Sequence, residues 1–434
     1  MAEKCDVIVV GGGPAGLSAA YVLARAGLDV VVFERGDYSG SKNVMGGVIY
    51  RQPTQEILPD FPDDAPLERP VVEQAAWVLA KDSVIKAGHR SEAFACEPYN
   101  CHTVLRAKFD KWLAQQVAEA GALLVAETVV EEVIRDNGQV VGVRTGRPDG
   151  DLYADVVVAA DGVNSLLSKQ AGLHAELRAS DVSVVAKEII SLSADQVERR
   201  FNLDPGMGAT IEIFGNVAQG MVALGFIYTN KDSLSIGVGA MLSDLVEACA
   251  SPNDLMEHLK AHPAIRPLLL DGEVKEYMAH LIPEGMWDAV PPLYTDGMLV
   301  VGDAAGFVDS FHREGSNLAM LSAKMAAQTI LEAKRENDFS ARMMSRYARM
   351  IDDSIIGRDL RKYRKAPRFF DRHRAFFSLY PELANRAASE LITVDGIPKA
   401  EKQSQLIGMF LKERGPIGLV RDLWGAARAM RLPK

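Results

Sequence analysis

The fold is decided by the stretch Asp6-Val-Ile-Val-Val-Gly-Gly-Gly-Pro-Ala-Gly-Leu-Ser-Ala-Ala20, followed by Leu28-Asp-Val-Val-Val-Phe-Glu34. Residues 7–10 form a short, apolar, β-branched run, which predicts a strand buried on both faces, as in a parallel sheet. Gly11, Gly13 and Gly16 then have the G-x-G-x-x-G spacing. In this pattern a tight turn lets the backbone approach a pyrophosphate, and the third glycine lets the next helix pack closely.

A helix and a second strand complete the unit. Pro14 suits a first helical turn, and Ala15 opens a helix expected over residues 15–26, whose N-terminal N–H groups would point at phosphates. The strand expected over residues 30–33 ends in Glu34, whose carboxylate is placed to accept hydrogen bonds from an adenosine ribose. The order of these parts predicts a dinucleotide-binding βαβ unit, and its position at the N-terminus favours FAD, held as a prosthetic group, over NAD.

Composition narrows the class of protein. The 434 residues are 48% hydrophobic and 24% charged, as in an ordinary globular protein of two or three domains. The net charge of −10 argues against general nucleic-acid binding. We find no signal peptide and no apolar stretch of about 18 residues, the length of a transmembrane helix. A cytoplasmic protein is therefore expected, either free or peripheral on the cytoplasmic face of the membrane.

The cysteines are Cys5, Cys96, Cys101 and Cys249. They are too few and too scattered for a disulfide framework. A four-iron cluster needs about four thiolates in a compact pattern, whereas only Cys96 and Cys101 lie close together. We therefore expect no metal site in this chain, and buried or loop thiols are favoured over a redox pair.

Residues 35–47, Arg-Gly-Asp-Tyr-Ser-Gly-Ser-Lys-Asn-Val-Met-Gly-Gly, are too rich in Gly and Ser for regular structure. Gly46 and Gly47 would remove side chains where a flat ring lies, although a simple turn explains them equally well. The candidate cofactor contacts in this segment are Arg35, Lys42, Asn43, Gly46 and Gly47.

Further along the chain, the five prolines of residues 52–70 predict an irregular segment at the surface. A strand is expected at residues 77–85. A helix is expected within residues 104–121; Arg106 at its start is either a cofactor contact or a solvated side chain. Strands are then expected at 122–126, 128–135 and 140–145, with a hairpin turn at Asn137-Gly138. A buried strand over 152–160 ends in Asp161-Gly162, which we expect to be a second cofactor contact.

The pattern changes at about residue 173. Alternating strands at 183–190, 209–214, 221–228 and 233–241, with a helix at 245–262, predict an inserted, mostly antiparallel domain whose sheet roofs a substrate pocket. The expected division is 1–172 for the first part of the FAD-binding domain, 173–292 for the substrate domain, 293–340 for the return to FAD binding and 341–434 for a helical C-terminal region. The fold class is therefore α/β.

The return segment supplies the last candidate residues. A buried strand ends in Gly302-Asp303, where Asp303 would lie beside the pyrophosphate and ribityl hydroxyls. Gly315, Ser316 and Asn317 open a long helix, whose dipole would stabilise negative charge on a reduced flavin ring. His312 lies near the expected ring, although a surface histidine is the favoured interpretation.

Taken together, the glycine triad, Glu34, Asp161-Gly162 and Gly302-Asp303 resemble the three-part FAD fingerprint of the glutathione-reductase-like flavoproteins. This branch includes p-hydroxybenzoate hydroxylase, geranylgeranyl reductases and electron-transfer-flavoprotein:quinone oxidoreductase. Residues 40–47, Gly-Ser-Lys-Asn-Val-Met-Gly-Gly, resemble the signature loop of the FixC family of the Fix (EtfABCX) systems. The glycines, Glu34, Asp303 and the loop glycines match the family pattern directly, whereas Arg106 and Asn317 match it by position only.

The resemblance implies an FAD-dependent oxidoreductase that takes electrons from the electron-transfer flavoprotein subunits (FixA/FixB, or EtfA/EtfB) and passes them to a quinone. It also implies a ferredoxin-like FixX subunit carrying an iron–sulfur cluster. The alternatives are a geranylgeranyl-reductase-type enzyme acting on prenyl lipids, an aromatic monooxygenase that uses NAD(P)H, and a structural subunit that only holds partners together. No residue can be named as a quinone ligand or as the proton donor.

The C-terminal region is basic between residues 358 and 374. This segment is either a solvated face or a docking surface for anionic lipid or an acidic partner. A helical stripe near the end either packs as core or lies in a membrane interface. The stripe consists of Leu419, Val420, Leu423, Trp424, Ala427 and Met430.

Overall fold

The structure is a computed structural model that describes residues 4–43 and 47–430. The chain forms two compact units. Unit 1 comprises Met1–Glu68, Asn100–Val182 and Leu281–Arg364, and unit 2 comprises Arg69–Tyr99, Ser183–His280 and Lys365–Lys434. The division differs from the expected boundaries. Residues 69–99 belong to unit 2, where they pair with its sheet. Residues 173–182, 281–292 and 341–364 belong to unit 1, where the last of these segments packs as helices.

Unit 1 contains the parallel sheet that the N-terminal pattern predicts. The strand order is β16-β17-β10-β1-β2-β7, with β1, β2, β7, β10 and β17 parallel and β16 antiparallel. Its central strand β1 is almost wholly buried, as its β-branched sequence requires. The strands are β1 (Lys4–Val10), β2 (Val30–Phe33), β7 (Leu123–Val125), β10 (Asp151–Ala159), β16 (Tyr294–Thr295) and β17 (Met298–Val300).

Two smaller strand pairs join unit 1. The hairpin of β8 (Val130–Asp136) and β9 (Gln139–Thr145) extends the sheet through β10, and β3 (Val48–Tyr50) pairs with β6 (Cys101–Val104). At the hairpin turn Asn137 has a φ of +49° and Gly138 a φ of +89°. Both residues therefore have the positive φ values that an Asn-Gly hairpin turn uses, which confirms the predicted turn.

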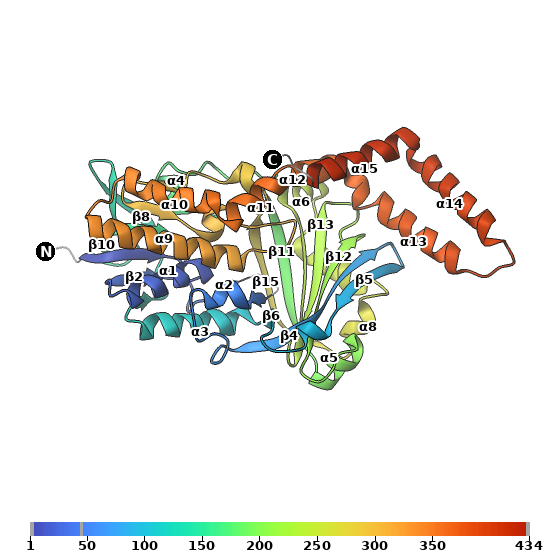
Figure 1. Cartoon of the computed structure of the whole chain (residues 1–434), viewed down its shortest axis with the longest axis horizontal. Helices are drawn as coiled ribbons and strands as arrows, with labels where there is room; N and C mark the ends of the chain where they lie inside the picture. Colours follow the sequence, from blue (N-terminus) through green and yellow to red (C-terminus); the bar gives the residue numbers. More distant parts are fainter. Residues whose placement is uncertain (1–3, 44–46, 431–434) are drawn as a thin grey trace. The chain divides into compact units, whose positions relative to one another are not determined.

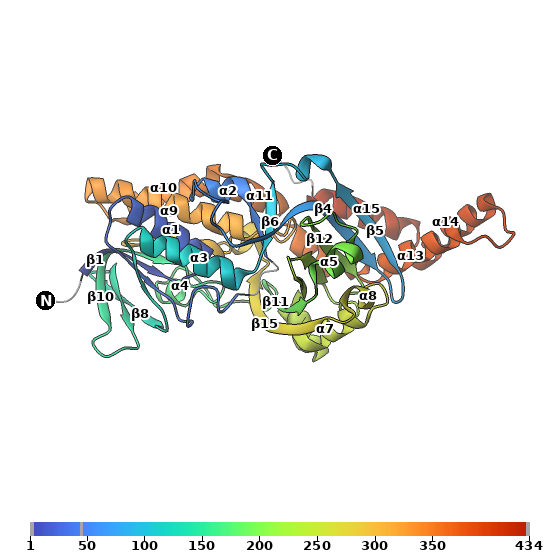
Figure 2. The same cartoon turned by 90° about the horizontal axis from the view of Figure 1, so that it is seen from below.

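The helices of unit 1 cover the parallel sheet, and Figures 1 and 2 show α1 and α9 beside one another along it. They are α1 (Pro14–Arg25), α2 (Arg51–Gln55), α3 (Arg106–Glu119), α4 (Leu166–Gln170), α9 (Ser316–Glu336), α10 (Ala341–Asp353) and α11 (Ile355–Tyr363), with 3₁₀ turns η2 (Met286–Ala289) and η3 (Gly302–Ala305). The prediction that residues 52–70 lie at the surface is wrong for part of the stretch. Ile57, Leu58 and Phe61 are buried in the core of unit 1, because apolar side chains between the prolines point inward.

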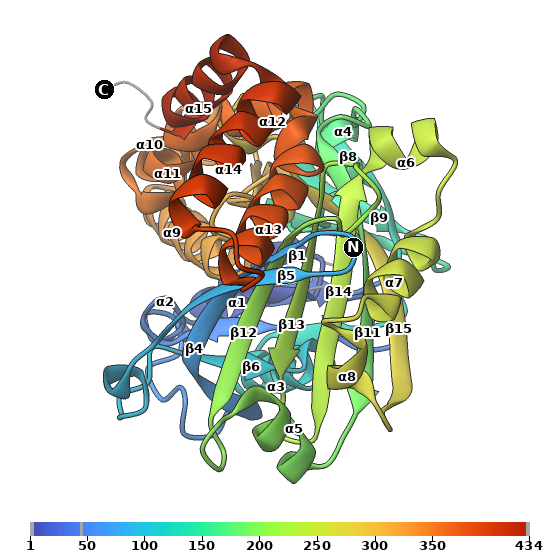
Figure 3. The ribbon, with the colours of Figure 1, turned by 90° about the vertical axis from the view of Figure 1, so that its right-hand side faces the viewer.

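Unit 2 is built on a sheet with the order β15-β11-β14-β13-β12-β4, and β5 pairs with β4 (Figure 3). It is mostly antiparallel, as predicted, but β12 and β4 run parallel. The strands are β4 (Leu67–Leu79), β5 (Val84–Arg90), β11 (Val182–Ser191), β12 (Gly208–Gly215), β13 (Ala223–Thr229), β14 (Ser233–Met241) and β15 (Glu273–Pro283).

Short helices pack on one face of this sheet. They are α5 (Ala194–Phe201), α6 (Leu242–Ala248), α7 (Pro252–Ala261) and α8 (Arg266–Leu269), with the 3₁₀ turn η1 (Glu92–Phe94) in a connection. Two expected elements are corrected. The strand expected at 77–85 is two strands, since Ala80 donates its N–H to Ser83 across a turn. The helix expected at 245–262 is interrupted, because Ser251 and Pro252 start α7 with a capping box.

The C-terminal part of unit 2 is helical, as predicted. It contains α12 (Ala366–Arg372), the 3₁₀ turn η4 (Arg374–Phe376), α13 (Leu379–Ile392), α14 (Lys399–Arg414) and α15 (Pro416–Met430). In sequence order α13, α14 and α15 each contact the next, and α12 contacts α15. These helices contribute few residues to the large hydrophobic clusters, which leaves much of their apolar surface exposed.

Candidate functional site

The first part of the candidate site is the turn between β1 and α1. Gly11 has a φ of +112°, and a Cβ atom added to it would lie 2.1 Å from the carbonyl oxygen of Ala160. A Cβ on Gly16 would lie 1.9 Å from the carbonyl oxygen of Gly11. Around Gly13, the N-cap of α1, an added Cβ would meet no atom within 4 Å. Gly11 and Gly16 therefore permit close packing, while the start of α1 stays open beside Gly13, as phosphate binding at a helix N-terminus requires.

Glu34 connects this turn to the segment that follows β2. Its carboxylate accepts hydrogen bonds from the backbone N–H of Gly12 at 2.8 Å and from that of Gly36 at 2.6 Å. These two bonds fix the orientation of the carboxylate, and each ionised oxygen can accept a further bond from a ribose hydroxyl. Pro14 is the first residue of α1, in the position where its missing N–H costs nothing.

The following loop folds back onto the start of α3. Asn43 is buried and its amide donates to the carbonyl oxygen of Gly40 at 2.7 Å. Gly47 has a φ of +102°, and an added Cβ would lie 1.9 Å from the carbonyl oxygen of Val104. Arg35 and Lys42 are exposed. Gly46 lies outside the described residues.

Arg106 is the first residue of α3 and is not a solvated side chain. Its guanidinium donates two hydrogen bonds of 2.6 Å to the carboxylate of Asp110, which is fully buried. Burial by itself would lower the pKa of Arg106, but the charges of Asp110 and Asp303 raise it above its usual value. Arg106 therefore stays charged and links α3 electrostatically to the segment after β17. Sequence reasoning missed Asp110, although its i,i+4 spacing from Arg106 on a predicted helix was a usable signal.

The segment after β17 lies against the first turn of α1. Gly302 has a φ of +62°, and its N–H donates to Ser322 Oγ at 3.1 Å. A Cβ on Gly302 would lie 2.7 Å from the Cβ of Ala15 and 3.5 Å from that of Ala319. The starts of α1 and α9 and the residue Asp303 are thus brought to one end of the parallel sheet, where ligands of such sheets bind.

Asp161 and Gly162 follow β10 at the same end of the sheet. Asp161 Oδ2 accepts the N–H of Leu167 at 3.0 Å and so caps α4, whereas its buried Oδ1 has no hydrogen-bond partner among the described residues. Burial raises the pKa of Asp161. Gly162 has a φ of +73°, a conformation that favours glycine. The structure thus gives Asp161 a helix-capping contact in addition to the cofactor contact expected from the sequence.

The N-terminus of α9 forms the other end of the candidate site. Gly315 is the N-cap of this 21-residue helix, and Ser316 and Asn317 are buried in its first turn. The Asn317 amide donates to Glu314 Oε2 at 2.7 Å, while its Oδ1 is buried without a partner among the described residues. An unsatisfied acceptor suits an N–H of a polar ring, and the helix N-terminus suits a carbonyl oxygen or negative charge of that ring.

Family models match two parts of the chain. An FAD binding domain matches residues 4–204, and the C-terminal domain of the ETF-QO/FixC family matches residues 366–431. Protein FixC of Azorhizobium caulinodans is 44% identical over 432 residues, which cover 99% of both chains. The probable electron transfer flavoprotein-quinone oxidoreductase YdiS of Escherichia coli is 39% identical over 422 residues, which cover 97% of both chains.

Solved structures show the same fold. A geranylgeranyl bacteriochlorophyll reductase-like protein from Thermoplasma acidophilum has a TM-score of 0.74 at 23% identity and covers 98% of this chain and 99% of its own. The flavin-dependent brominase Bmp2 has a TM-score of 0.66 at 18% identity, with 94% of this chain and 100% of its own covered. These TM-scores show that the chain shares its architecture with both structures.

The fold, the FAD-binding model and the glycine turn define an FAD-dependent oxidoreductase. The chain belongs to the FixC family, as its full-length relatives show. FAD fits the residues present: an open helix start beside Gly13, an oriented carboxylate at Glu34 and an unsatisfied acceptor at Asn317.

Proposed function

We propose that this chain accepts electrons from a reduced electron-transfer flavoprotein and passes them to a membrane quinone. The carrying observation is the likeness, over 97% of the chain, to a protein named a probable electron transfer flavoprotein-quinone oxidoreductase. The match of residues 366–431 to the ETF-QO/FixC C-terminal domain supports the same assignment. The donors would be the FixA/FixB or EtfA/EtfB type of flavoprotein subunits.

FAD, when bound, exchanges electrons singly or in pairs, which is the chemistry that such a relay requires. The residues of unit 1 would hold it. The α1 N-terminus would bind the pyrophosphate, Glu34 the ribose, and the α9 N-terminus the ring edge on which negative charge increases during reduction. Asp303, held beside the charge of Arg106, is proposed to accept hydrogen bonds from the sugar-like chain.

A separate ferredoxin-like FixX subunit is proposed to carry the iron–sulfur cluster. The four cysteines are free thiols, of which Cys5 and Cys101 are buried and Cys96 and Cys249 are exposed. Their places in the chain do not supply the compact set of thiolates that a cluster requires. The cluster expected in such a system would therefore belong to a partner.

We further propose that the C-terminal helices meet the cytoplasmic face of a membrane. None of the described helices is long and apolar enough to cross a bilayer. The described residues include 20 exposed large apolar side chains, and ten of these lie between residues 391 and 424. This short segment therefore concentrates exposed apolar surface. The ten side chains are Leu391, Ile392, Val394, Ile397, Ile407, Leu411, Ile417, Val420, Leu423 and Trp424.

Basic side chains lie beside this apolar surface. Lys365, Arg368 and Arg372 are exposed at i, i+3 and i+7 at and within α12, and α12 packs against α15 through Phe369 and Gly425. On α15 itself, Arg428 lies over the ring of Trp424 at 5.4 Å. Apolar side chains bordered by basic ones are typical of helices that lie in an anionic membrane interface.

Rapid-mixing absorbance tests the relay directly. The purified FAD-loaded chain is mixed with reduced electron-transfer flavoprotein, and a soluble quinone analogue is then added. We expect bleaching of the flavin absorbance, followed by reoxidation that depends on the quinone. A flavin that stays oxidised with this donor but is reduced by NADPH would contradict the relay and favour a monooxygenase or prenyl-lipid reductase.

A further inference from the structure

A closed loop precedes the helix whose N-terminus is proposed to meet the flavin ring. Asp309 and Glu314 form an isolated antiparallel bridge, with the Asp309 N–H donating to Glu314 O at 2.8 Å and the Glu314 N–H donating to Asp309 O at 3.1 Å. Gly315, the N-cap of α9, follows directly. The loop therefore holds its four central residues, Ser310-Phe-His-Arg313, next to the start of α9.

Asp309 fixes the ring of His312. Its carboxylate is buried and accepts three hydrogen bonds: Oδ1 accepts the N–H groups of Phe311 at 2.9 Å and His312 at 3.0 Å, and Oδ2 meets His312 Nδ1 at 2.9 Å. An ionised carboxylate only accepts hydrogen bonds, so it places the proton of a neutral imidazole on Nδ1. Nε2 is then the nitrogen that can take up and release a proton.

Aromatic packing fixes the loop from a second side. The ring of Phe311 stacks on Tyr363 of α11, with centroids 4.8 Å apart and an interplanar angle of 11°. The edge of His312 meets the same Tyr363 ring at 4.7 Å. The His312 side chain is nevertheless 43% exposed, so its imidazole is oriented and still in contact with solvent. Arg313 and Glu314 follow His312 in the loop. Lys362 Nζ lies 4.9 Å from the centroid of the same Tyr363 ring.

We propose that His312 delivers a proton to the quinone as it is reduced, with Asp309 as its positioning residue. The inference rests on the proposed function. When bound, FAD in its reduced form would supply the electron pair and one of the two protons that the quinone needs. The His312 imidazolium would supply the second proton as its Nε2–H bond breaks, so that two O–H bonds form on the quinone. The products would be the quinol and a neutral imidazole, which regains a proton from solvent.

The alternative role for this pair is structural, since Asp309 also holds the loop together through two backbone N–H groups. Two electron acceptors separate the roles. A quinone analogue needs protons to become a quinol, whereas the ferricenium ion accepts one electron and no proton. The ratio of the two reoxidation rates therefore reports proton delivery, while loss of loop structure would slow both reactions together.

The experiment uses the full FAD-loaded chain, chemically reduced and then mixed with either acceptor. For His312→Ala we expect the quinone-to-ferricenium rate ratio to fall by about 100-fold, a typical contribution of a positioned acid. Added imidazole should restore part of the quinone rate. Asp309→Asn should lower the ratio less, because the ring remains but its Nδ1 proton loses the ionised acceptor. His89→Ala, which changes an exposed histidine of β5, should leave the ratio unchanged.

A readout independent of turnover is the ¹⁵N spectrum of the histidine rings, in which His312 is assigned by its loss in His312→Gln. We expect a protonated Nδ1 and an unprotonated Nε2 in the neutral ring, and a mixture of tautomers in Asp309→Asn. An unchanged rate ratio in His312→Ala, or loss of FAD from both His312 variants, would overturn the proposal. If quinone does not reoxidise the unaltered reduced chain, the proposed function itself fails, and this inference fails with it.

Discussion

The carboxylate of Glu34 orders two turns of unit 1 through its bonds to Gly12 and Gly36. Glu34→Gln replaces one acceptor oxygen by an amide that donates, so one of these N–H groups loses its acceptor. Hydrogen bonds to charged groups contribute about 1.5–3 kcal/mol, which corresponds to a roughly 10- to 100-fold weaker affinity for FAD. Fluorescence titration of the apoprotein with FAD measures this change.

The matched control for Glu34 is Glu247→Gln, which removes the same charge from an exposed position on α6. We expect it to bind FAD with unchanged affinity. Equal affinities for the two variants would contradict the assignment of Glu34 to the ribose.

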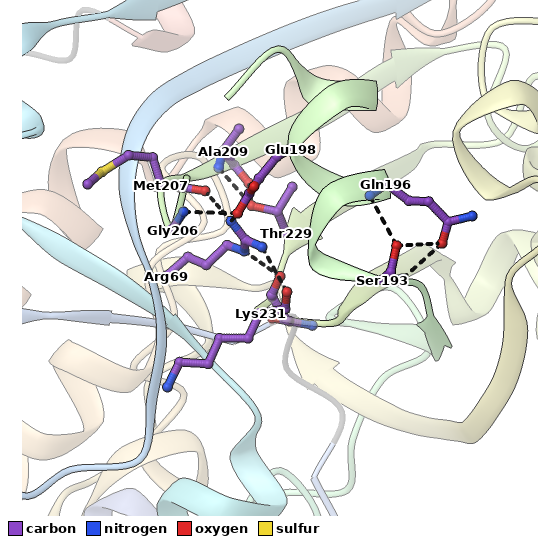
Figure 4. A network of polar contacts seen from close by, with 10 residues as sticks. Arg69, Ser193, Gln196, Glu198, Gly206, Met207, Ala209, Thr229 and Lys231 are labelled. Carbon is purple, nitrogen blue, oxygen red and sulfur yellow. Dashed lines mark hydrogen bonds and ion pairs between the residues drawn. The ribbon is translucent and has the colours of Figure 1, made fainter. Parts of the chain in front are cut away.

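Arg69 is a buried cation whose guanidinium is held within unit 2 (Figure 4). It donates to Glu198 Oε1 at 2.8 Å and to the carbonyl oxygens of Asn230, Met207 and Lys231 at 2.6–2.9 Å. Arg69→Ala leaves these acceptors without their donor. We expect a loss of about 3–5 kcal/mol in the free energy of unfolding, seen as a lower urea midpoint by circular dichroism.

The contrast is Arg199→Ala, which breaks a salt bridge between the largely exposed side chains of Arg199 and Asp195. Exposed pairs contribute about 0–1 kcal/mol, so the urea midpoint should hardly move. A midpoint for Arg69→Ala equal to that of Arg199→Ala would show that water replaces the buried contacts of Arg69.

At the scale of the element, α15 differs from a core helix because its large apolar side chains are exposed. Its buried side carries Asp422, Ala426 and Ala429, while Val420 and Trp424 are 68% and 64% exposed. The stripe expected from the sequence to pack as core or to lie in a membrane interface is thus largely outside the core.

Changing Val420 and Trp424 to Ser should weaken binding to vesicles that contain anionic lipid. Each large apolar side chain contributes about 1.5–3 kcal/mol when fully buried, so the double variant should bind at least about tenfold more weakly. Sedimentation with vesicles measures the bound fraction. Leu166→Ser, at an exposed position of α4, is the control, and an equal loss in both proteins would contradict membrane docking by α15.

At the scale of the whole molecule, cofactor binding and membrane docking are proposed for different units of the chain. Unit 1 contains every proposed FAD contact that the structure describes, together with the Asp309–His312 pair. Unit 2 contains the C-terminal helices that match the ETF-QO/FixC domain and carry the exposed apolar surface. The relay proposal therefore assigns cofactor binding to one unit and membrane docking to the other.

The sequence by itself determined the features that short-range patterns specify. Strand, glycine turn, helix and strand follow one another within the first 34 residues, so β1, α1 and β2 were predicted to within a residue or a few at each end. The Asn137-Gly138 turn and the strands β11 to β14 were likewise readable from local composition. The single helix predicted over residues 245–262 was wrong because two local signals compete there. The apolar pattern favours one continuous helix, whereas Ser251-Pro252 begins a new one.

Only the tertiary structure decided which side chains meet. Asp303 lies close enough to Arg106 to raise the pKa of the guanidinium, although almost 200 residues separate them in the sequence. Tyr363, at the end of α11, packs against the ring of His312 in the loop before α9. The sequence favoured a surface role for His312 because nothing in a linear pattern shows that Asp309 is buried. Long-range packing sets the burial and the neighbours of each polar group, and these determine whether a charged side chain is solvated, structural or available for chemistry.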